Sequence, residues 1–408
     1  MKVGWQTKTL GELAEVFADG DWVESKDQST EGVRLIQTGN VGEGFFKDRG
    51  DKARYISEAT FKRLRCTEIF EGDCLISRLP DPVGRCCLLP DTGERMITAV
   101  DCTIVRFDSK QIIPVFFNYY SQSTDYLDAV DAETSGTTRN RISRANLGKI
   151  AVPVPPLPEQ QRIVGILDAA FEGIATAKAN AEQNLRNARA LFESHLQSVF
   201  TQRGEGWVRA RMDAIYRVGS SKRVLKSEWK SEGVPFYRGR EVTRLAANGF
   251  VDNELFISEE HFAELSKEYG VPKSGDIVIT AIGTIGNAHI VRGSDRFYFK
   301  DASVLWMKRS AEVSSEFIKF WLKSSLFFDQ LDRGNGATVD TLTIQKLQSV
   351  ELFLPPIDEQ LKIVAQLDSL SEETQRLESL YQRKLAALDE LKKSLLHQAF
   401  SGQLIRDN

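Results

Sequence analysis

The sequence predicts an α+β protein in which two globular α/β domains alternate with two long helices, and three observations support this. A Pro-Pro-led stretch occurs twice, at 155–164 and 355–364, in a constant register (359 − 159 = 200). Each copy runs on into a long helical pattern, and the segment before each copy mixes short strand patterns with turn residues. A repeat whose period is half the chain indicates a duplicated architecture with internal pseudosymmetry.

The long helices are predicted by their start signals and by their apolar spacing. Each Pro-Pro pair ends the preceding strand, because proline lacks an N–H and holds the residue before it out of the α region. Apolar or small residues then recur mostly at steps of three and four, at Ile163, Leu167, Ala170, Ile174, Ala177, Ala181, Leu185, Ala188, Phe192 and Val199, and at Ile363, Leu367, Leu370, Leu377, Tyr381, Leu385, Leu388, Leu391 and Leu395. This spacing predicts helices of roughly 60 Å that pack lengthwise on another helix. The nearest candidate partner of each is the other copy.

The repeat also predicts the domain boundaries. We expect a first globular domain at 1–156, a first helix at 157–203, a second globular domain at 204–356, a second helix at 357–402 and a tail at 403–408. The two globular segments have diverged while the helices remain alike, which suits the binding of two different targets at a fixed separation.

Within the first globular segment, turn and alternation patterns predict several elements. Residues 5–16 show a short helical pattern, 33–37 and 71–77 read as strands, 99–107 alternates like a strand, and 114–128 is an aromatic helix candidate. From about Trp207 the second segment restates these elements loosely, with Asp301 opposite Asp101.

Composition and charge narrow the class of protein. The formal net charge of −4 does not by itself indicate nucleic-acid binding, although acidic residues on the helices can offset the positive charge of basic loops. No apolar run approaches the roughly 20 residues of a membrane span, and the first residues do not resemble a signal peptide, so we expect a cytoplasmic protein. The five cysteines all lie in the first half without CxxC spacing, which favours plain thiols over metal ligands or disulfides.

No catalytic apparatus is evident in the sequence. There is no GxxxxGK[ST] phosphate loop, no dinucleotide-binding GxGxxG after a strand and no HExxH metal site. We therefore expect no catalytic residue and no metal site in this chain. An enzyme with an unfamiliar motif remains an alternative, which activity of the isolated chain would reveal.

Polar and basic side chains gather instead on turn-rich segments of both domains. Arg, Lys and Asn meet phosphates or base edges in DNA, so these segments are candidates for DNA binding. The candidates in the first domain are Gln37, Thr38, Asn40, Arg78, Arg85, Thr137, Thr138, Arg139, Asn140 and Arg141. Those in the second are Lys222, Arg223, Arg238, Arg240, Thr280, Thr284, Asn287, Asn335 and Thr338. The simpler alternative, solvated polar loops that aid solubility, stays open for each.

Two variable globular domains, each followed by Pro-Pro-Leu/Ile-x-Glu-Gln-x-x-Ile-Val and a long helix, resemble the specificity subunit of type I restriction-modification systems. The resemblance covers essentially the whole chain, and Ser135-Gly136-Thr137-Thr138 is similar to the usual lead-in to the first helix. The second lead-in departs from it, since it reads Asn335-Gly336-Ala337-Thr338.

The resemblance implies a prokaryotic, cytoplasmic, non-catalytic subunit that reads a bipartite, asymmetric DNA site. Each globular domain would be a target-recognition domain for one half-site, and the helices would form an antiparallel coiled coil that sets the spacer. Two modification subunits would bring S-adenosylmethionine chemistry, and restriction subunits would bring ATP- and Mg-dependent translocation and cleavage.

The helix motif itself has two interpretations. Its residues Glu159, Gln160, Ile163, Val164, Glu359, Gln360, Ile363 and Val364 could hold partner subunits, with the polar ones facing away from the coil. Glu and Gln also suit the first turn of a helix through contacts with backbone N–H groups. A coiled-coil scaffold whose globular domains bind protein is a further alternative, and salt-dependent DNA binding would argue against it.

Overall fold

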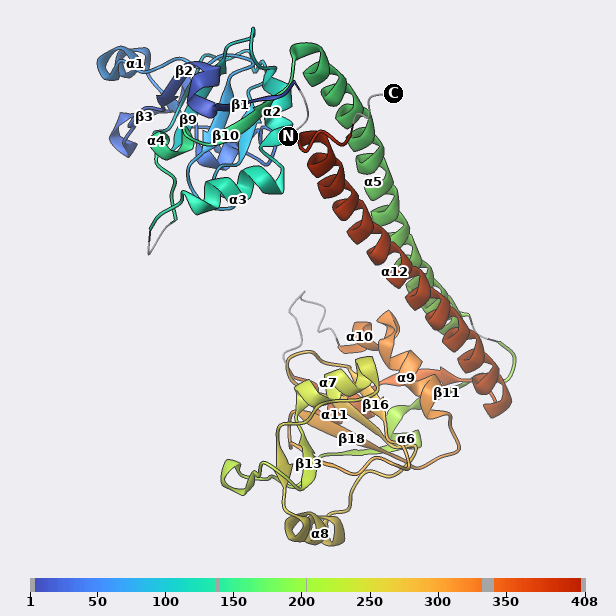
Figure 1. Cartoon of the computed structure of the whole chain (residues 1–408). Helices are drawn as coiled ribbons and strands as arrows, with labels where there is room; N and C mark the ends of the chain where they lie inside the picture. The colour runs from blue at the N-terminus through green and yellow to red at the C-terminus, as the bar shows by residue number, and fades with distance from the viewer. Residues whose placement is uncertain (1–3, 137–139, 203, 332–340, 405–408) are drawn as a thin grey trace. The chain divides into compact units, whose positions relative to one another are not determined.

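The computed structural model describes residues 4–136, 140–202, 204–331 and 341–404 of the 408-residue chain. The chain divides into two compact units, Met1–Glu182 with Arg383–Asn408, and Gln183–Gln382. Each unit joins one globular domain to parts of both long helices, α5 (Leu157–Thr201) and α12 (Ile357–Phe400) (Figure 1). The second unit is continuous in sequence, whereas the first is completed by the end of α12.

The first globular domain, domain 1, contains two four-stranded sheets and one strand pair. The sheet orders are β2-β9-β6-β7 and β3-β5-β4-β8, and β1 pairs antiparallel with β10. The strands are β1 Gln6–Thr9, β2 Ala14–Asp19, β3 Gln28–Ser29, β4 Val33–Ile36, β5 Tyr55–Ile56, β6 Cys74–Ser77, β7 Cys86–Leu88, β8 Met96–Thr98, β9 Cys102–Phe107 and β10 Ala151–Val154. The helices are α1 Glu58–Leu64, α2 Pro114–Tyr120, α3 Thr124–Ala132 and α4 Arg144–Leu147.

The second globular domain, domain 2, repeats this plan. Its sheets have the orders β12-β18-β15-β16 and β14-β13-β17, and β11 pairs antiparallel with β19. The strands are β11 Val208–Arg211, β12 Tyr216–Gly219, β13 Val234–Tyr237, β14 Phe256–Ile257, β15 Ile277–Thr280, β16 Ala288–Ile290, β17 Tyr298–Phe299, β18 Val304–Arg309 and β19 Glu351–Leu354. The helices are α6 Met212–Ile215, α7 Gly239–Asn248, α8 Glu259–Glu268, α9 Ser315–Lys323, α10 Ser325–Leu331 and α11 Ile344–Ser349.

Two predictions about local structure were wrong. Residues 5–16 form β1, a 3₁₀ helix and β2 in place of one helix, because β1 pairs with β10 and this tertiary pairing outweighs a short helical pattern. The predicted helix at 114–128 is two helices, since Ser123 accepts a hydrogen bond from the backbone N–H of Tyr126 and so caps the start of α3. The predicted strands at 33–37 and 71–77 are confirmed as β4 and β6, while that at 99–107 begins later, at Cys102.

The long helices are confirmed, and within each unit they run antiparallel (Figure 1). Lys178 of α5 pairs with Asp389 of α12 in one unit, and Arg189 pairs with Glu378 at 3.1 Å in the other. The apolar and small residues that were predicted to lie along the contact between the two helices are buried or half-buried with one exception, Leu391, which is 46% exposed. Beside it the Lys392 side chain turns inward, where its ammonium lies 5.2 Å from the ring centre of Phe171.

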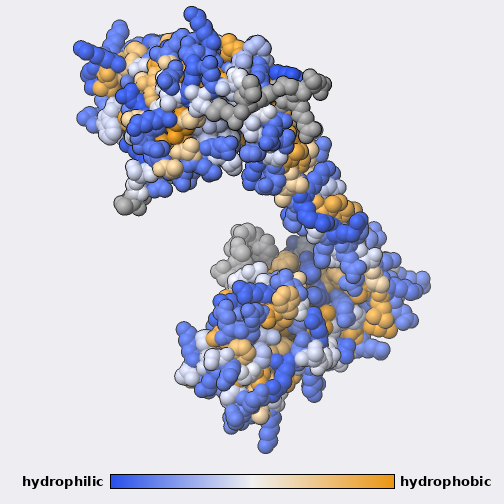
Figure 2. Space-filling view, viewed as in Figure 1, coloured by the Kyte–Doolittle hydropathy of each residue, from blue (hydrophilic) through white to orange (hydrophobic). Residues whose placement is uncertain are grey.

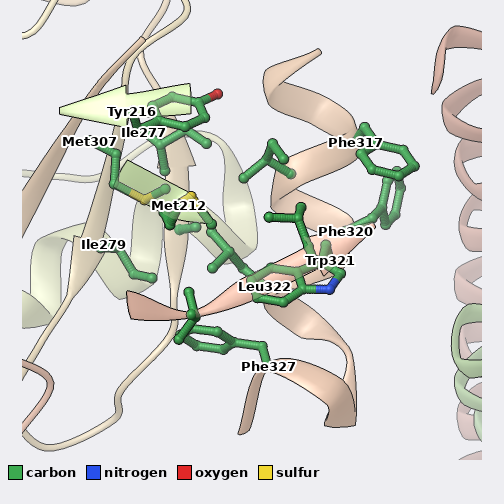
Figure 3. Packing of buried hydrophobic residues seen from close by; sticks show 14 of the residues in the cluster. Met212, Tyr216, Ile277, Ile279, Met307, Phe317, Phe320, Trp321, Leu322 and Phe327 are labelled. Carbon is green, nitrogen blue, oxygen red and sulfur yellow. The ribbon is translucent and has the colours of Figure 1, made fainter. Parts of the chain in front are cut away.

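Each domain buries in its core the C-terminal end of the long helix that follows the other domain: domain 1 buries the end of α12, and domain 2 buries the end of α5. In domain 1, Phe400 packs against Phe116 with ring centres 5.3 Å apart, and in domain 2, Phe200 packs against Phe317 at 5.2 Å. Figure 3 shows the domain 2 core, where Phe317 and Trp321 of α9 belong to the same cluster as sheet residues such as Ile277. Burial of each such aromatic side chain contributes roughly 1.5–3 kcal/mol.

The surface seen in Figure 2 is mostly hydrophilic, with scattered hydrophobic patches. Among the described helices, none combines the length and apolar character that a membrane span requires. All five cysteines are free thiols, and four of them are buried.

Candidate nucleic-acid interface

In domain 1, hydrogen bonds join four loops that carry most of the predicted DNA-binding residues. The backbone N–H of Arg78 donates to the carbonyl of Asp101 (2.9 Å), and the N–H of Ile142 donates to the carbonyl of Arg78 (3.3 Å). The Arg141 guanidinium lies 3.1 Å from the Asp101 carboxylate. The Arg85 guanidinium reaches the carbonyl of Thr38 at 3.0 Å. The structure therefore brings residues far apart in sequence to one loop cluster.

Two candidates in this cluster hold the loops in shape. Arg85 is buried, and all three of its guanidinium nitrogens donate to backbone carbonyls, which include that of Val41 (2.9 Å). Burial lowers the pKa of Arg85. Asn40 is 9% exposed, accepts from the N–H of Gln37 (3.0 Å) and donates to the carbonyl of Lys47 (3.0 Å). Both side chains are buried and bonded to the loop backbone, which fits a role in holding the loops in shape.

Arg78 is partly bonded to the loops and partly without a hydrogen-bond partner in the described part of the chain. It is buried, its guanidinium lies 3.1 Å from the Asp19 carboxylate, and it also donates to the carbonyl of Val100. Its Nε has no hydrogen-bond partner among the described residues. The accessible candidates of this cluster are the half-buried Gln37 and Thr38 and the exposed Asn140 and Arg141.

Five predicted residues lie outside the described part of the chain. They are Thr137, Thr138, Arg139, Asn335 and Thr338.

Domain 2 builds a similar cluster around the loop that follows β15. The buried Thr280 hydroxyl donates to the carbonyl of Thr284 and accepts from the N–H of Asn287 (3.0 Å). The Asn287 amide also donates to the hydroxyl of Thr243 on α7 (3.2 Å). Thr284 is exposed, and so is its neighbour Ile282, so this loop presents one hydroxyl and one apolar group to solvent.

The arginines at the start of α7 share a buried carboxylate. Arg238 Nη2 lies 2.8 Å from Glu241 Oε1, and Arg240 pairs with both Glu241 and Glu254. Burial alone would raise the pKa of Glu241, but hydrogen bonds from Arg238 and Arg240 lower it to about 2. Arg238 is half-buried and Arg240 is exposed at this helix end.

The early basic stretch of domain 2 joins the same region through Asp301. Arg223 Nε lies 2.8 Å from the Asp301 carboxylate, and the N–H of Ala281 donates to the carbonyl of nearby Ser303 (2.9 Å). Lys222 is exposed, and its ammonium lies 5.3 Å from the ring centre of Tyr269.

The two clusters share a backbone framework and differ in side chains. The bond from Ile142 to Arg78 in domain 1 corresponds to one from the N–H of Leu342 to the carbonyl of Ala281 (2.8 Å) in domain 2. Asp101 and Asp301, which match in the repeat, each bind an arginine, but from different segments. A common frame therefore presents two different sets of polar groups.

The helix motif is part of the domain cores. Gln160 and Gln360 are almost fully buried, and their amide oxygens accept from the N–H groups of Ile113 (2.8 Å) and Ser314 (2.9 Å). Their amide nitrogens donate to the carbonyls of Pro155 and Pro355. Each glutamine therefore ties the first turn of its helix to its own domain, and both side chains are buried there.

The other motif residues follow the same pattern. The residues that pack into the two cores are Ile163, Val164, Ile363 and Val364. Glu359 accepts from the indole N–H of Trp207 at 3.0 Å, and both Glu359 and Glu159 are half-buried. No group of three metal-binding side chains occurs within the described residues.

A sequence profile for the type I restriction modification DNA specificity domain matches residues 2–185 and 204–385. The chain belongs to this family. The two matches coincide with the two copies of the repeat, so the duplication seen in the sequence is a duplication of the specificity domain.

Several members of the specificity-domain family are similar to this chain in sequence. A type I restriction enzyme specificity subunit of Haemophilus influenzae is 28% identical over 57% of this chain, and the EcoBI specificity subunit of Escherichia coli is 24% identical over 70%. These matches span 59% and 65% of the lengths of the two relatives.

Solved structures show the same fold. A chain from a structure on complex assembly and conformational transition of the type I R-M system has a TM-score of 0.80 at 18% identity, with 99% of both chains covered. The HsdS subunit from Thermoanaerobacter tengcongensis has a TM-score of 0.65 at 17% identity, covering 99% of this chain and 98% of that one. This chain therefore shares its fold with these solved structures over nearly its whole length.

Sequence reasoning missed the acidic and apolar members of the specificity-domain loops. Asp19 pairs with Arg78 at 3.1 Å and with Arg144 at 3.5 Å, and its charge is opposite to that of the basic residues that the sequence pattern indicates. Ile282 was overlooked because only polar groups were considered, although a glycine follows it directly and marks it as a loop residue.

Proposed function

We propose that this chain is the non-catalytic, sequence-reading specificity subunit of a type I restriction-modification complex. One observation carries the proposal: the two specificity domains hold their loops in the same hydrogen-bonded frame but present different side chains. Two domains with the same backbone frame and different side chains suit a bipartite, asymmetric DNA site, of which each domain reads one half.

In domain 1, the proposed DNA contacts come from Gln37, Thr38, Asn140 and Arg141, with Arg78 behind them. In domain 2 they come from Lys222, Arg223, Arg240 and the Thr284 loop. Arginine and lysine supply contacts to phosphates, and arginine and asparagine can also contact base edges. The buried Arg85, Asn40, Thr280 and Glu241 position these loops from within.

The coiled coil is proposed to set the spacer between the half-sites. Its helices of 45 and 44 residues each extend about 66 Å at 1.5 Å per residue. The proposed partners are two modification subunits, which bring S-adenosylmethionine and methylate DNA, and restriction subunits, which use ATP and Mg. The proposed location is the prokaryotic cytoplasm.

The test is to co-express the chain with the modification subunit encoded beside it and to map methylation across a plasmid library by single-molecule sequencing. A split, asymmetric motif with a fixed gap is expected. Replacement of residues 1–156 by another family member's domain should change one half-site only, and replacement of 204–356 should change the other. A stable complex without methylation, or activity from this chain alone, would contradict the proposal.

A further inference from the structure

A second polar site lies in domain 2, away from the loops that are proposed to contact DNA, here called the recognition loops. It is a cavity of about 490 Å³ between the C-terminal end of α7, β16, α9 and α12. Its polar lining includes Arg292, Lys319, Lys323, Asp368, Ser371 and Gln375. The recognition loops meet α7 at its other end, near Gly239, and a ten-residue helix separates the two ends by about 15 Å.

The cations of this cavity lack direct counterions. Among the described residues, neither the Lys319 nor the Lys323 ammonium lies within 4 Å of a carboxylate oxygen. Lys319 is half-buried, and burial lowers its pKa. Arg292 donates from Nη1 to the carbonyl of Gly249 at 3.1 Å, which fixes the guanidinium beside the cavity.

Two carboxylates, those of Glu316 and Asp368, also line the cavity, and both residues are exposed. Among the lining side chains, three cations face two carboxylates, while a third carboxylate, that of Asp295, contacts His289 (2.8 Å) and the backbone N–H of Arg292 (2.9 Å) outside the lining. A partly desolvated ammonium without an ion pair is costly, and a bound anion would offset that cost.

Domain 1 shows what the same position looks like without this feature. The residues before α2 and α9 that donate to Gln160 and Gln360 are Ile113 and Ser314, so these two helices correspond in a register of 314 − 113 = 201. Lys319 and Lys323 therefore correspond to Asn118 and Gln122.

The two domain 1 amides are used internally. Asn118 donates to the carbonyl of Gly44 at 2.8 Å. Gln122 donates to the carbonyl of Asn118 at 3.0 Å and accepts from Lys392 at 2.9 Å. In the 200-residue register of the long helices, Ser371 corresponds to Phe171, which packs on Tyr119 with ring centres 5.3 Å apart. Domain 1 thus has two neutral amides and a ring where domain 2 has two ammonium groups and a serine, and its one ammonium there, that of Lys392, is already bound by Gln122 and lies 5.2 Å from the ring centre of Phe171.

We propose that this cavity is an anion site that binds a phosphate group, with Lys319 and Lys323 as its charged contacts and Ser371 and Gln375 as neutral donors. Its volume suits a small phosphorylated molecule, and a phosphate of the DNA backbone offers the same chemistry. Binding of a small phosphorylated molecule stands apart from the function proposed above, whereas binding of a DNA backbone phosphate rests on that function.

The test uses the full chain and three variants. Lys319→Asn with Lys323→Gln installs the amides of domain 1, and Ser371→Phe installs its ring and fills the cavity while both lysines remain. Lys267→Gln removes an exposed lysine of α8 as the matched control. Inorganic phosphate is titrated by calorimetry against chloride at equal ionic strength, and non-specific duplex DNA is titrated over a range of salt concentrations.

Phosphate is expected to bind the wild type and Lys267→Gln, and to bind the double variant and Ser371→Phe at least tenfold more weakly. The other source is the DNA backbone. In that case free phosphate does not bind, and the double variant reduces the slope of log affinity for DNA against log salt by the amount expected for the loss of one or two phosphate contacts. If the double variant and Ser371→Phe match the control in both titrations while their melting curves show folded protein, the site does not exist.

Discussion

Lengthening the coiled coil should lengthen the spacer of the DNA site that the complex prefers. The insertion belongs in the middle of both helices, after Glu182 in α5 and before Arg383 in α12, away from the helix residues that belong to the two domain cores. An insertion after Asp168 would instead disturb domain 1, because Asp168 accepts a hydrogen bond from the Tyr119 hydroxyl. Seven residues in each helix preserve the seam of a coiled coil, whose apolar positions repeat every seven residues.

The expected change follows from two lengths. Seven helical residues add about 10.5 Å at 1.5 Å per residue. If the added length separates the two domains along the duplex, whose rise is about 3.4 Å per base pair, the preferred spacer should grow by about three base pairs. An insertion in one helix alone would misalign the paired seams and is expected to destabilise the chain.

The assay is methylation by the reconstituted complex on plasmids with graded spacers, from the native length to twelve base pairs longer. Both half-sites stay unchanged, which controls for damage to the recognition loops. An active complex that still prefers the native spacer would refute the idea that the coil sets this distance.

Three further predictions concern single residues. Gln160→Ala should lower the free energy of unfolding by about 1–3 kcal/mol, since it leaves buried backbone groups unpaired, whereas the exposed Gln161→Ala should change little in denaturant melts. If Arg141 contacts a base, Arg141→Ala should weaken binding of domain 1's half-site by about 1–3 kcal/mol. If Arg141 contacts a phosphate, the substitution should only reduce the slope of log affinity against log salt by about one. Unchanged binding in fluorescence titrations would show that Arg141 is not part of the interface. Because the pKa of Glu241 is about 2, below its ordinary 4.5, its contribution to stability is complete above about pH 5 and is lost as the pH falls toward 2. Glu241→Gln should flatten this part of the acid-denaturation profile, and an unaltered profile would contradict the assignment.

The helices and the duplicated plan could be predicted from the sequence because their signals are local. Pro155 and Pro355 mark strand ends, and the apolar steps after them need no knowledge of the partner. The loop clusters were less predictable, because burial in the tertiary structure decides which polar side chains remain available. Arg85 and Arg141 look alike in sequence, yet one is enclosed by carbonyls and the other is exposed.

Gln160 illustrates the same limit. A polar residue in the first turn of a helix usually faces solvent, whereas the Gln160 amide bonds to the backbone of Ile113, which lies 47 residues earlier in the sequence, and of Pro155. A pattern on one helix does not contain that information.

The discontinuous first unit has a consequence for the order of folding during synthesis. Domain 2 and its parts of the helices come from one continuous segment, Gln183–Gln382, and can assemble once that segment has left the ribosome. Domain 1 is translated first, but its core includes Leu396, Ala399 and Phe400 from the end of α12. Until those residues emerge, the first domain exposes an apolar surface, so the part of the protein that is made first is completed last.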